Sequence, residues 1–163
     1  MRRWVLSKKD RKKLARSLSE CYPRFSLKNY DKVEVIVEGS TRIYMLDGIP
    51  AFIEDPALGT KPIPHLVFLL RRGYEWLPAI TVDEGAVRPI SRGADLMRPG
   101  IVDIRGAFAK GEVVVVAEPN RGLPIAVHEA LYSSEEIREM EKGRVSRSLH
   151  HIGDRFWKLA EGA

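Results

Sequence analysis

Short apolar segments separated by glycine and proline turns limit the fold of this chain more than any other feature. Val113–Ala117 is entirely apolar, and Asn120–Gly122 separates it from the next apolar segment, Pro124–Val127. Segments of this length, rich in valine and isoleucine and bounded by turn residues, are typical of β-strands. Val145–Ile152 is predicted as the last strand. Many short strands with glycine turns predict a small, mixed β-barrel for the second half of the chain.

The elements expected between these strands are also short. Ile80–Val82 and Ala86–Ile90 are predicted as two strands joined by a turn at Asp83–Gly85, because acidic residues before a glycine are common in turns. Arg92–Met97 is expected to form a short helix, and Pro99-Gly100 to end it.

A second short helix is expected later in this half. Ser133 and Glu136 have the spacing of a capping box, in which each side chain satisfies a free backbone N–H of the first turn. We expect this charged helix to end at Gly143. Gly153-Asp154 is predicted as a turn, with a short closing segment at Phe156-Trp157.

The first half of the chain mixes helices and strands. Ser7, followed by Asp10, predicts a helix N-cap, and Leu14, Leu18 and Cys21 then repeat at helical spacing. The elements expected after this helix are three strands at Val33–Val37, Thr41–Leu46 and Ile49–Ile53, and a helix from about Pro64 to Gly73. Two domains are therefore predicted, residues 1–78 and residues 79–163.

Two dipeptides in this half carry specific expectations. Asp47-Gly48 predicts a tight hairpin, because both residues tolerate the positive φ that such a turn requires. Pro50 lacks a backbone N–H and therefore predicts that Ile49–Ile53 lies at the edge of its sheet.

Positive charge is concentrated at the front of the chain. The whole chain has a net charge of +5, whereas residues 1–32 hold eleven Lys or Arg and three acids, a net charge of +8. The helical spacing leaves one group of cations facing outward: Lys8, Lys9, Lys12, Lys13 and Arg16. A basic front on a nearly neutral body suggests a phosphate-rich partner, although a solvated helix face would look the same.

Few residue patterns point to catalysis. There is no Gly-rich phosphate loop and no Gly-x-Ser-x-Gly nucleophile elbow. Cys21 is the only cysteine, which excludes zinc sites built from cysteine pairs. His65, His128, His150 and His151 have no metal-ligand spacing with nearby acids. The sequence therefore predicts a protein that is not an enzyme and has neither cofactor nor metal site.

The same composition bears on location. The chain has no apolar stretch of membrane-spanning length, and polar residues follow the basic Met1–Trp4 where a signal peptide would need an apolar core. A single cysteine allows no intrachain disulfide. These features predict a cytoplasmic protein with no membrane partner.

Residues 82–157 resemble a known domain. The resemblance rests on an ordered set of motifs: Val82–Val87, Gly93–Ile101, Gly111–Val115, Ile125–Val127, Ser133–Ile137, and His151-Ile152-Gly153-Asp154 followed by Trp157. This pattern is similar to the PUA domain, an RNA-binding pseudo-barrel shared by pseudouridine synthases and archaeosine transglycosylases. The family often has glycine where this chain has His128. The resemblance implies an α+β protein with a small N-terminal α+β domain followed by a C-terminal PUA pseudo-β-barrel.

The N-terminal half narrows the resemblance. Lys32–Ile53, Pro62–Leu70 and Leu77-Pro78 are similar to the malignant-T-cell-amplified-sequence, or translation-machinery-associated, family and its archaeal relatives. That family implies structured RNA as partner (tRNA, small-subunit rRNA or both), the small ribosomal subunit, and a density-regulated-protein-like protein partner.

The PUA resemblance also implies where RNA would lie. It carries onto Arg92, Gly93, Ala94, Asp95, Met97, Arg98, Pro99, Gly100 and Ile101, with His150 and His151 on the last strand as further candidates. Small Gly93 and Gly100 would let a nucleic-acid backbone approach, and Arg92 and Arg98 would contact phosphates. Met97 taken alone is expected in the core.

Three functions remain open at this point. The first is a translation factor-like adaptor that contacts the small subunit and tRNA during initiation or recycling. The second is an RNA-binding accessory module for a tRNA or rRNA modification enzyme acting in trans. The third is an enzyme with an unrecognised site in the N-terminal domain.

Overall fold

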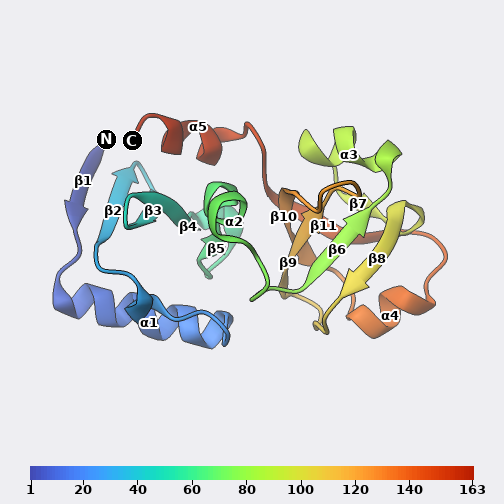
Figure 1. Cartoon of the computed structure of the whole chain (residues 1–163), viewed down its shortest axis with the longest axis horizontal. Helices are drawn as coiled ribbons and strands as arrows, with labels where there is room; N and C mark the ends of the chain where they lie inside the picture. The colour runs from blue at the N-terminus through green and yellow to red at the C-terminus, as the bar shows by residue number, and fades with distance from the viewer.

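The computed structural model describes residues 1–163, which form two β-sheets arranged along the longest axis of the molecule (Figure 1). The first sheet has five antiparallel strands in the order β1-β2-β3-β4-β5. These strands are β1 (Arg2–Val5), β2 (Val33–Glu38), β3 (Thr41–Leu46), β4 (Ile49–Glu54) and β5 (Ile63–Pro64). The chain therefore builds this sheet almost entirely from neighbouring hairpins.

The second sheet has six strands in the order β7-β11-β10-β9-β6-β8. They are β6 (Ala79–Val82), β7 (Leu96–Met97), β8 (Ile101–Arg105), β9 (Val113–Ala117), β10 (Pro124–Ala130) and β11 (Arg144–His151). β6 and β9 pair in parallel, and the other pairs are antiparallel. The mixed, curled arrangement agrees with the α+β fold and pseudo-barrel expected from the sequence.

Five α-helices cover the sheets: α1 (Lys8–Cys21), α2 (Leu66–Arg72), α3 (Glu84–Ser91), α4 (Ser134–Glu139) and α5 (Arg155–Glu161). Three short 3-10 turns are η1 (Leu27–Asn29), η2 (Pro56–Leu58) and η3 (Arg98–Gly100). α1 lies below the first sheet, α5 above it, and α2 between the two sheets (Figure 1). None of the helices combines the length and the apolar character needed to cross a membrane.

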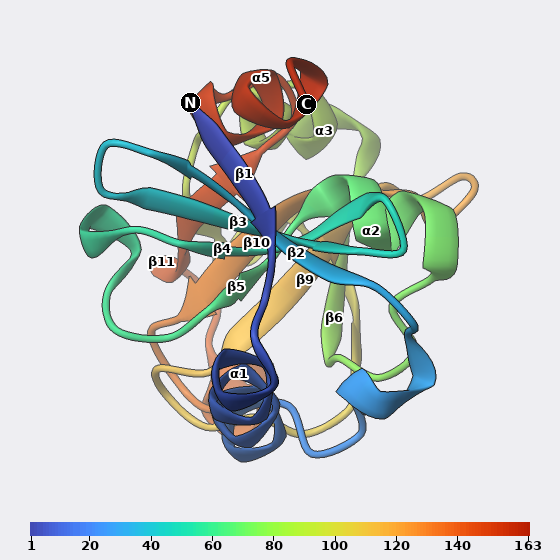
Figure 2. The same ribbon diagram turned by 90° about the vertical axis from the view of Figure 1, so that its left-hand side faces the viewer.

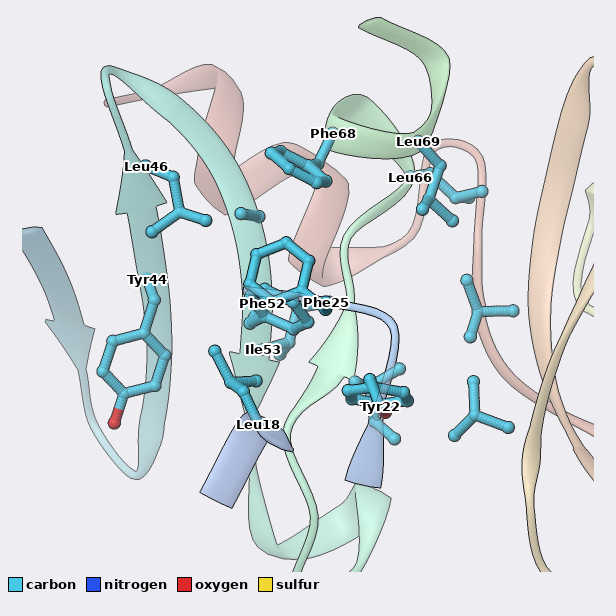
Figure 3. Close-up of a cluster of buried hydrophobic side chains, with 14 of the residues drawn as sticks. Leu18, Tyr22, Phe25, Tyr44, Leu46, Phe52, Ile53, Leu66, Phe68 and Leu69 are labelled. Carbon is cyan, nitrogen blue, oxygen red and sulfur yellow. The ribbon is translucent and has the colours of Figure 1, made fainter. Parts of the chain in front are cut away.

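The two sheets share one hydrophobic core. A cluster of 26 buried residues joins Phe52 and Phe68 from the first half to Val115 and Val127 from the second (Figure 3 shows part of it). Phe25 packs edge-on against Phe52, with the ring centroids 5.0 Å apart. Because this cluster is continuous, separating the halves would expose large apolar surfaces to water.

Most elements expected from the sequence are confirmed. The Ser7 side chain accepts a hydrogen bond from the Asp10 N–H at 3.1 Å and caps α1. Ser133 and Glu136 form the expected capping box of α4, which ends at Glu139 rather than at Gly143.

The hairpin expected at Asp47-Gly48 is also confirmed, with φ of 48° and 81°. Pro50, however, does not mark an edge strand, because β4 lies between β3 and β5. β5 is so short that it pairs only with Phe52 and Ile53, and therefore leaves Pro50 without a strand on that side.

Two predicted elements around residue 90 are wrong. Ala86–Ile90 lies in α3 rather than in a strand, because the Asp83 side chain accepts a hydrogen bond from the Ala86 N–H at 2.9 Å and starts a helix. Arg92–Met97 is not a helix but a turn that leads into β7. The apolar character of Ala86–Ile90 was recognised correctly. The segment was assigned to a strand rather than a helix because capping by Asp83 was not considered.

Four elements were not expected: β1, β5, β8 and α5. β1 and β8 are edge strands with mostly exposed residues, so neither has a clear apolar pattern. α5 packs Leu159 and Ala160 against Ile36, Ile43 and Met45 of the first sheet, so the end of the chain returns to the N-terminal half.

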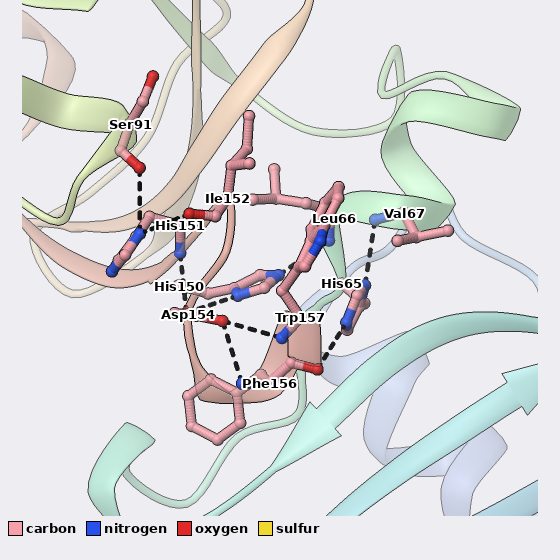
Figure 4. Close-up of polar contacts among 10 residues, drawn as sticks. All are labelled: His65, Leu66, Val67, Ser91, His150, His151, Ile152, Asp154, Phe156 and Trp157. Atoms are coloured by element: carbon pink, nitrogen blue, oxygen red, sulfur yellow. Dashed lines mark hydrogen bonds and ion pairs between the residues drawn. The ribbon is translucent and has the colours of Figure 1, made fainter. Parts of the chain in front are cut away.

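Asp154 holds this return segment in place (Figure 4). One of its carboxylate oxygens accepts hydrogen bonds from the Phe156 and Trp157 N–H groups, at 3.0 and 2.9 Å, and thereby caps α5. The other accepts from His150 Nδ1 at 2.8 Å and from the His151 N–H at 2.9 Å. Burial raises the pKa of Asp154, but these donors outweigh it and lower the pKa to about 2.

Two buried histidines continue the network from Asp154 to α2. His150 Nε2 accepts from the Leu66 N–H at 3.1 Å, while His65 Nε2 lies 3.2 Å from the Phe156 carbonyl oxygen and donates to it. His65 Nδ1 accepts from the Val67 N–H at 3.0 Å. Burial lowers the pKa of His65 to about 3, so its ring is neutral in the folded protein. The network therefore ties β11, α5 and α2 together.

We expect Asp154→Ala to destabilise the protein by about 3 kcal/mol, because it removes a helix cap and leaves His150 without its acceptor. Asp83→Ala is the matched control, since Asp83 also caps a helix but its carboxylate accepts only one hydrogen bond, from the Ala86 N–H. That variant should lose about 1 kcal/mol. Urea unfolding measures the stability of both variants. Equal losses would show that the contacts of Asp154 with His150 and His151 add nothing beyond the capping of α5.

Acid should destabilise the protein before its carboxylates titrate. His65 and His128 have pKa values lowered from 6.5 to about 3 and about 4. Below pH 6.5 the unfolded chain therefore takes up protons that the folded chain refuses, and stability falls by up to about 1.4 kcal/mol per pH unit for each histidine. Urea unfolding at pH 7.5, 6.0 and 5.0 measures the fall, which should shrink in His128→Leu. Constant stability from pH 7 to 5 would contradict the buried, neutral histidines.

Candidate nucleic-acid interface

The candidate RNA-binding segment begins where α3 ends. Gly93 has a φ of +105°, and its N–H donates to the Ile90 carbonyl at 3.1 Å. The next N–H, of Ala94, donates to the Pro89 carbonyl at 3.0 Å. These two bonds are those of a Schellman motif, which requires a left-handed residue at the glycine position. The glycine is therefore needed for the turn itself.

Asp95 fastens this turn to the last strand. Its carboxylate accepts from the Ser148 N–H at 2.8 Å and from Arg144 Nη1 at 3.0 Å. Burial raises the pKa of Asp95, but these two donors outweigh it and the pKa is lowered. Asp95 thus positions the backbone, and Arg144 offsets the negative charge that the carboxylate would present to RNA.

The two arginines of the segment differ in their freedom. Arg98 donates from Nε to the Ile137 carbonyl at 2.7 Å, at the end of α4, and its side chain is half-buried. Arg92 is exposed, and its guanidinium makes neither a hydrogen bond nor an ion pair. Arg88, one turn earlier on α3, is equally exposed and unpaired. Sequence reasoning missed Arg88 because it was assigned to a strand.

His150 and His151 point to opposite faces of β11, as alternation along a strand requires. His150 is completely buried in the hydrogen-bond network around Asp154, so we leave it out of the interface. His151 faces the turn: its Nδ1 lies 3.1 Å from the Ser91 carbonyl oxygen (Figure 4), and its Nε2 lies 3.0 Å from where a Cβ on Gly93 would be.

Two apolar side chains of this region are exposed. Met97 is 51% exposed, which corrects the expectation that it lies in the core. Its strand, β7, is an edge strand of two residues, so no further strand pairs with it on that side. Ile152, directly after His151, is 37% exposed. Exposed apolar side chains such as these are suited to stacked bases.

Gly100 does not have the role expected of it. Its φ is not positive, and a Cβ there would lie 3.4 Å from Ala86 Cβ and 3.6 Å from Leu96 Cδ1. Its carbonyl accepts from the Asp83 N–H at 2.9 Å. The half-buried Gly100 therefore faces α3 and Leu96, where a Cβ would make ordinary van der Waals contact, rather than opening the surface to RNA. Of its neighbours, Pro99 is exposed and Ile101 is half-buried.

His128 lies beneath this surface and was not chosen from the sequence. Its Nδ1 lies 2.8 Å from Ser146 Oγ, and its Nε2 is buried without a hydrogen-bond partner. Burial lowers its pKa to about 4, against the opposing charge of Asp95. Its position after Ala126-Val127, where the family often has glycine, was the available signal.

The basic face of α1 forms a separate surface. Lys8, Lys9, Lys12, Lys13 and Arg16 are all exposed and outside any ion pair. Arg11 instead turns inward and donates to the Asp31 carbonyl at 2.9 Å. Figures 1 and 2 both place α1 along the lower edge of the molecule and α3 along the upper edge. The two surfaces therefore lie on opposite sides.

The buried histidines of the Asp154 network, His65 and His150, are unsuited to catalysis. The Asp154–His150 pair has the arrangement of a catalytic carboxylate and histidine, but His150 Nε2 is occupied by the Leu66 N–H and the ring is buried. A general base needs a free nitrogen within reach of substrate. No group of three or more His, Cys, Asp or Glu side chains in the structure is arranged to hold a metal ion.

Comparison with known proteins assigns a family to each half. The PUA domain model matches residues 78–152, and a domain of unknown function (DUF1947) matches residues 2–72. A PUA domain structure from Aeropyrum pernix superimposes with a TM-score of 0.87 at 31% sequence identity, covering 98% of this chain and 91% of that one.

Relatives also match over nearly the full length. An uncharacterised protein from Methanocaldococcus jannaschii is 35% identical over 164 residues, 97% of this chain and 96% of its own. Translation machinery-associated protein 20 of Saccharomyces cerevisiae is 27% identical over 172 residues, 93% of each chain. The yeast relative is named after the translation machinery rather than after a reaction. This chain belongs to the family of PUA-domain proteins that includes translation machinery-associated protein 20.

Proposed function

We propose that this chain binds RNA as part of the translation machinery, and that it contacts the small ribosomal subunit and tRNA. The family and its PUA domain support the RNA-binding, translation-associated part of this proposal. The observation that carries the finer part is the exposed surface at the end of α3. There a glycine turn, the free guanidinium of Arg92 and the exposed apolar side chain of Met97 follow one another within residues 92–97.

Each part of this surface suits single-stranded RNA. The turn at Gly93 and Ala94 presents backbone with little side chain, so a nucleotide can approach closely. Arg88 and Arg92 are free to contact phosphates. Met97 and Ile152, near opposite ends of β11, each offer apolar contact to unstacked bases. Unpaired RNA ends and loops display bases in the way this surface requires.

The basic face of α1 is proposed as a second contact. Because it lies opposite the turn, one small RNA loop does not reach both surfaces (Figures 1 and 2). A large particle such as the small subunit, with tRNA bound to it, presents phosphates on several sides. We expect the two surfaces to act together, since two linked contacts raise the effective concentration of each.

Testing this cooperation by cutting the chain near Pro78 is unsuitable, because the 26-residue core crosses that point. Substitutions in the full chain are the better test. A protein partner similar to density-regulated protein remains part of the proposal, as the family resemblance implies.

The alternative is an accessory RNA-binding module for a tRNA or rRNA modification enzyme acting in trans. The same turn would serve either function, so the partner distinguishes them. The full-length chain should sediment with purified small ribosomal subunits and be released by excess tRNA. Binding to tRNA with no association to subunits would favour the alternative.

We expect RNA affinity to fall steeply with salt, because bound cations release counterions from phosphates. Lys8→Ala combined with Lys12→Ala should weaken subunit binding and reduce the salt slope by about 0.7–0.9 for each phosphate that the variant no longer neutralises. Lys110→Ala combined with Lys158→Ala is the matched control, since it removes the same charge from exposed positions outside both surfaces. Titrations from low to moderate salt measure the slopes. Equal slopes for the two double variants would show that α1 only adds general charge.

Gly93→Ala should weaken RNA binding more than Arg92→Ala does. The new Cβ would meet His151 and strain a φ of +105°, so the turn would shift. Gly111→Ala is the control, because Gly111 has a φ of +89° with open space around its Cβ position. Both alanine variants should lose similar stability, about 1–2 kcal/mol.

Affinity for tRNA, measured on variants shown to be folded by circular dichroism, provides the readout. Unchanged affinity in folded Gly93→Ala would place the RNA elsewhere. Gly100→Val is expected to act through stability, because that position packs against α3.

A further inference from the structure

β1 is an open edge of the first sheet. It pairs with β2 on one side, and its other side faces no strand. The Leu6 N–H donates to the Val33 carbonyl at 2.9 Å, so by alternation Trp4 and Leu6 direct their backbone groups toward β2. Arg3 and Val5 therefore direct their N–H and C=O groups outward. Such a row of free backbone groups is a template for an added strand.

Apolar surface accompanies this edge. Val5 is 58% exposed and Trp4 is 38% exposed. Beside Trp4 lies a hollow of about 440 Å³, with Leu6, Leu14 and Tyr44 among its lining residues. A leucine or aromatic side chain fits such a space, so the edge offers a pocket as well as hydrogen bonds.

The charge around the edge is positive. Arg2 lies 5.4 Å from the centroid of the Trp4 ring, and Lys13 and Arg42 line the hollow. None of these three cations is in an ion pair. Asp10 and Glu54 also line the hollow and balance Lys13 and Arg42 there. The excess positive charge comes from Arg2 and the rest of residues 1–32, which together carry a net charge of +8. An acidic ligand is therefore favoured at this end of the molecule.

We propose that β1 is a docking site for an extended, acidic segment of a partner protein. The segment adds as a strand beside β1, and its main chain pairs with the outward groups of Arg3 and Val5. One of its large apolar side chains fills the hollow beside Trp4, while its acidic side chains face Arg2. Strand addition gains affinity from main-chain hydrogen bonds and specificity from side-chain pockets.

Other occupants fit the edge less well. A second copy of the chain would bring Arg2 and Arg3 of both copies close together, and like charges across a sheet edge are destabilising. RNA has no row of alternating donors and acceptors to match a strand edge. β1 also lies at the end of the molecule remote from α3 (Figure 1), so an occupant leaves the proposed RNA surface at the end of α3 free. This inference goes beyond the RNA-binding function and does not depend on it.

The test is selection of a displayed library of random ten-residue peptides on the full-length protein. We expect enriched peptides to alternate acidic and large apolar residues. Val5→Pro removes an outward N–H without breaking the β1–β2 ladder, and should weaken the binding of these peptides about tenfold. Trp4→Ala, which opens the hollow but keeps the backbone, should also weaken it. Val5→Thr is the control, because it keeps the N–H and the branched shape, and should bind normally.

Amide hydrogen exchange then locates the peptide. An added strand should protect the Arg3 and Val5 N–H groups and leave those of Trp4 and Leu6, already bonded to β2, nearly unchanged. Protection spread over Lys8–Arg16 instead, or full binding to Val5→Pro, would overturn the proposal. Dimers of the free protein that Val5→Pro dissociates would assign the edge to a second copy. Displacement of the peptide by tRNA, with weaker tRNA binding to Val5→Pro, would assign it to RNA; either result also overturns the proposal.

Discussion

The carboxylate of Asp154 is the polar interaction on which the return of the chain end to the first sheet depends. It caps α5, binds His150 on β11, and through His150 reaches the first turn of α2. α5 in turn covers the face of the first sheet that α1 and α2 leave open. Each of these contacts is buried or half-buried, where an unsatisfied polar group costs most. The network fixes the path of the last strand and hence the position of His151 beneath the turn.

Much of the fold could be predicted from the sequence, because apolar runs and turn residues agree at most positions. The errors fall where one signal has two explanations. Ala86–Ile90 is apolar enough for a strand, and only the capping by Asp83 decides for a helix. β1 and α5 are stable because they pack on elements distant in sequence, and no local pattern records such contacts. Pro50 was placed at an edge because the length of the neighbouring strand cannot be judged locally.

The candidate site was located from a resemblance, and the structure sorts its residues by role. Gly93 shapes the turn and Asp95 fastens it, whereas Arg92 and Met97 are left exposed. Gly100 faces α3, and His150 is buried. A motif gives the order of residues along a segment, but the direction of each side chain is set by the neighbouring strand and helix. The direction of a side chain decides whether a residue holds the surface in shape or is itself exposed on it.

The continuous core has a mechanical consequence. Phe52 and Phe68 pack in the same cluster as Val115 and Val127, so no flexible hinge lies between the two sheets. A molecule built in this way works as a spacer: it sets the separation and the angle between objects attached to its two ends. The basic helix and the strand edge at one end therefore keep a constant distance and orientation relative to the glycine turn at the other. A ligand at one end is positioned relative to a ligand at the other without movement of any part of the protein.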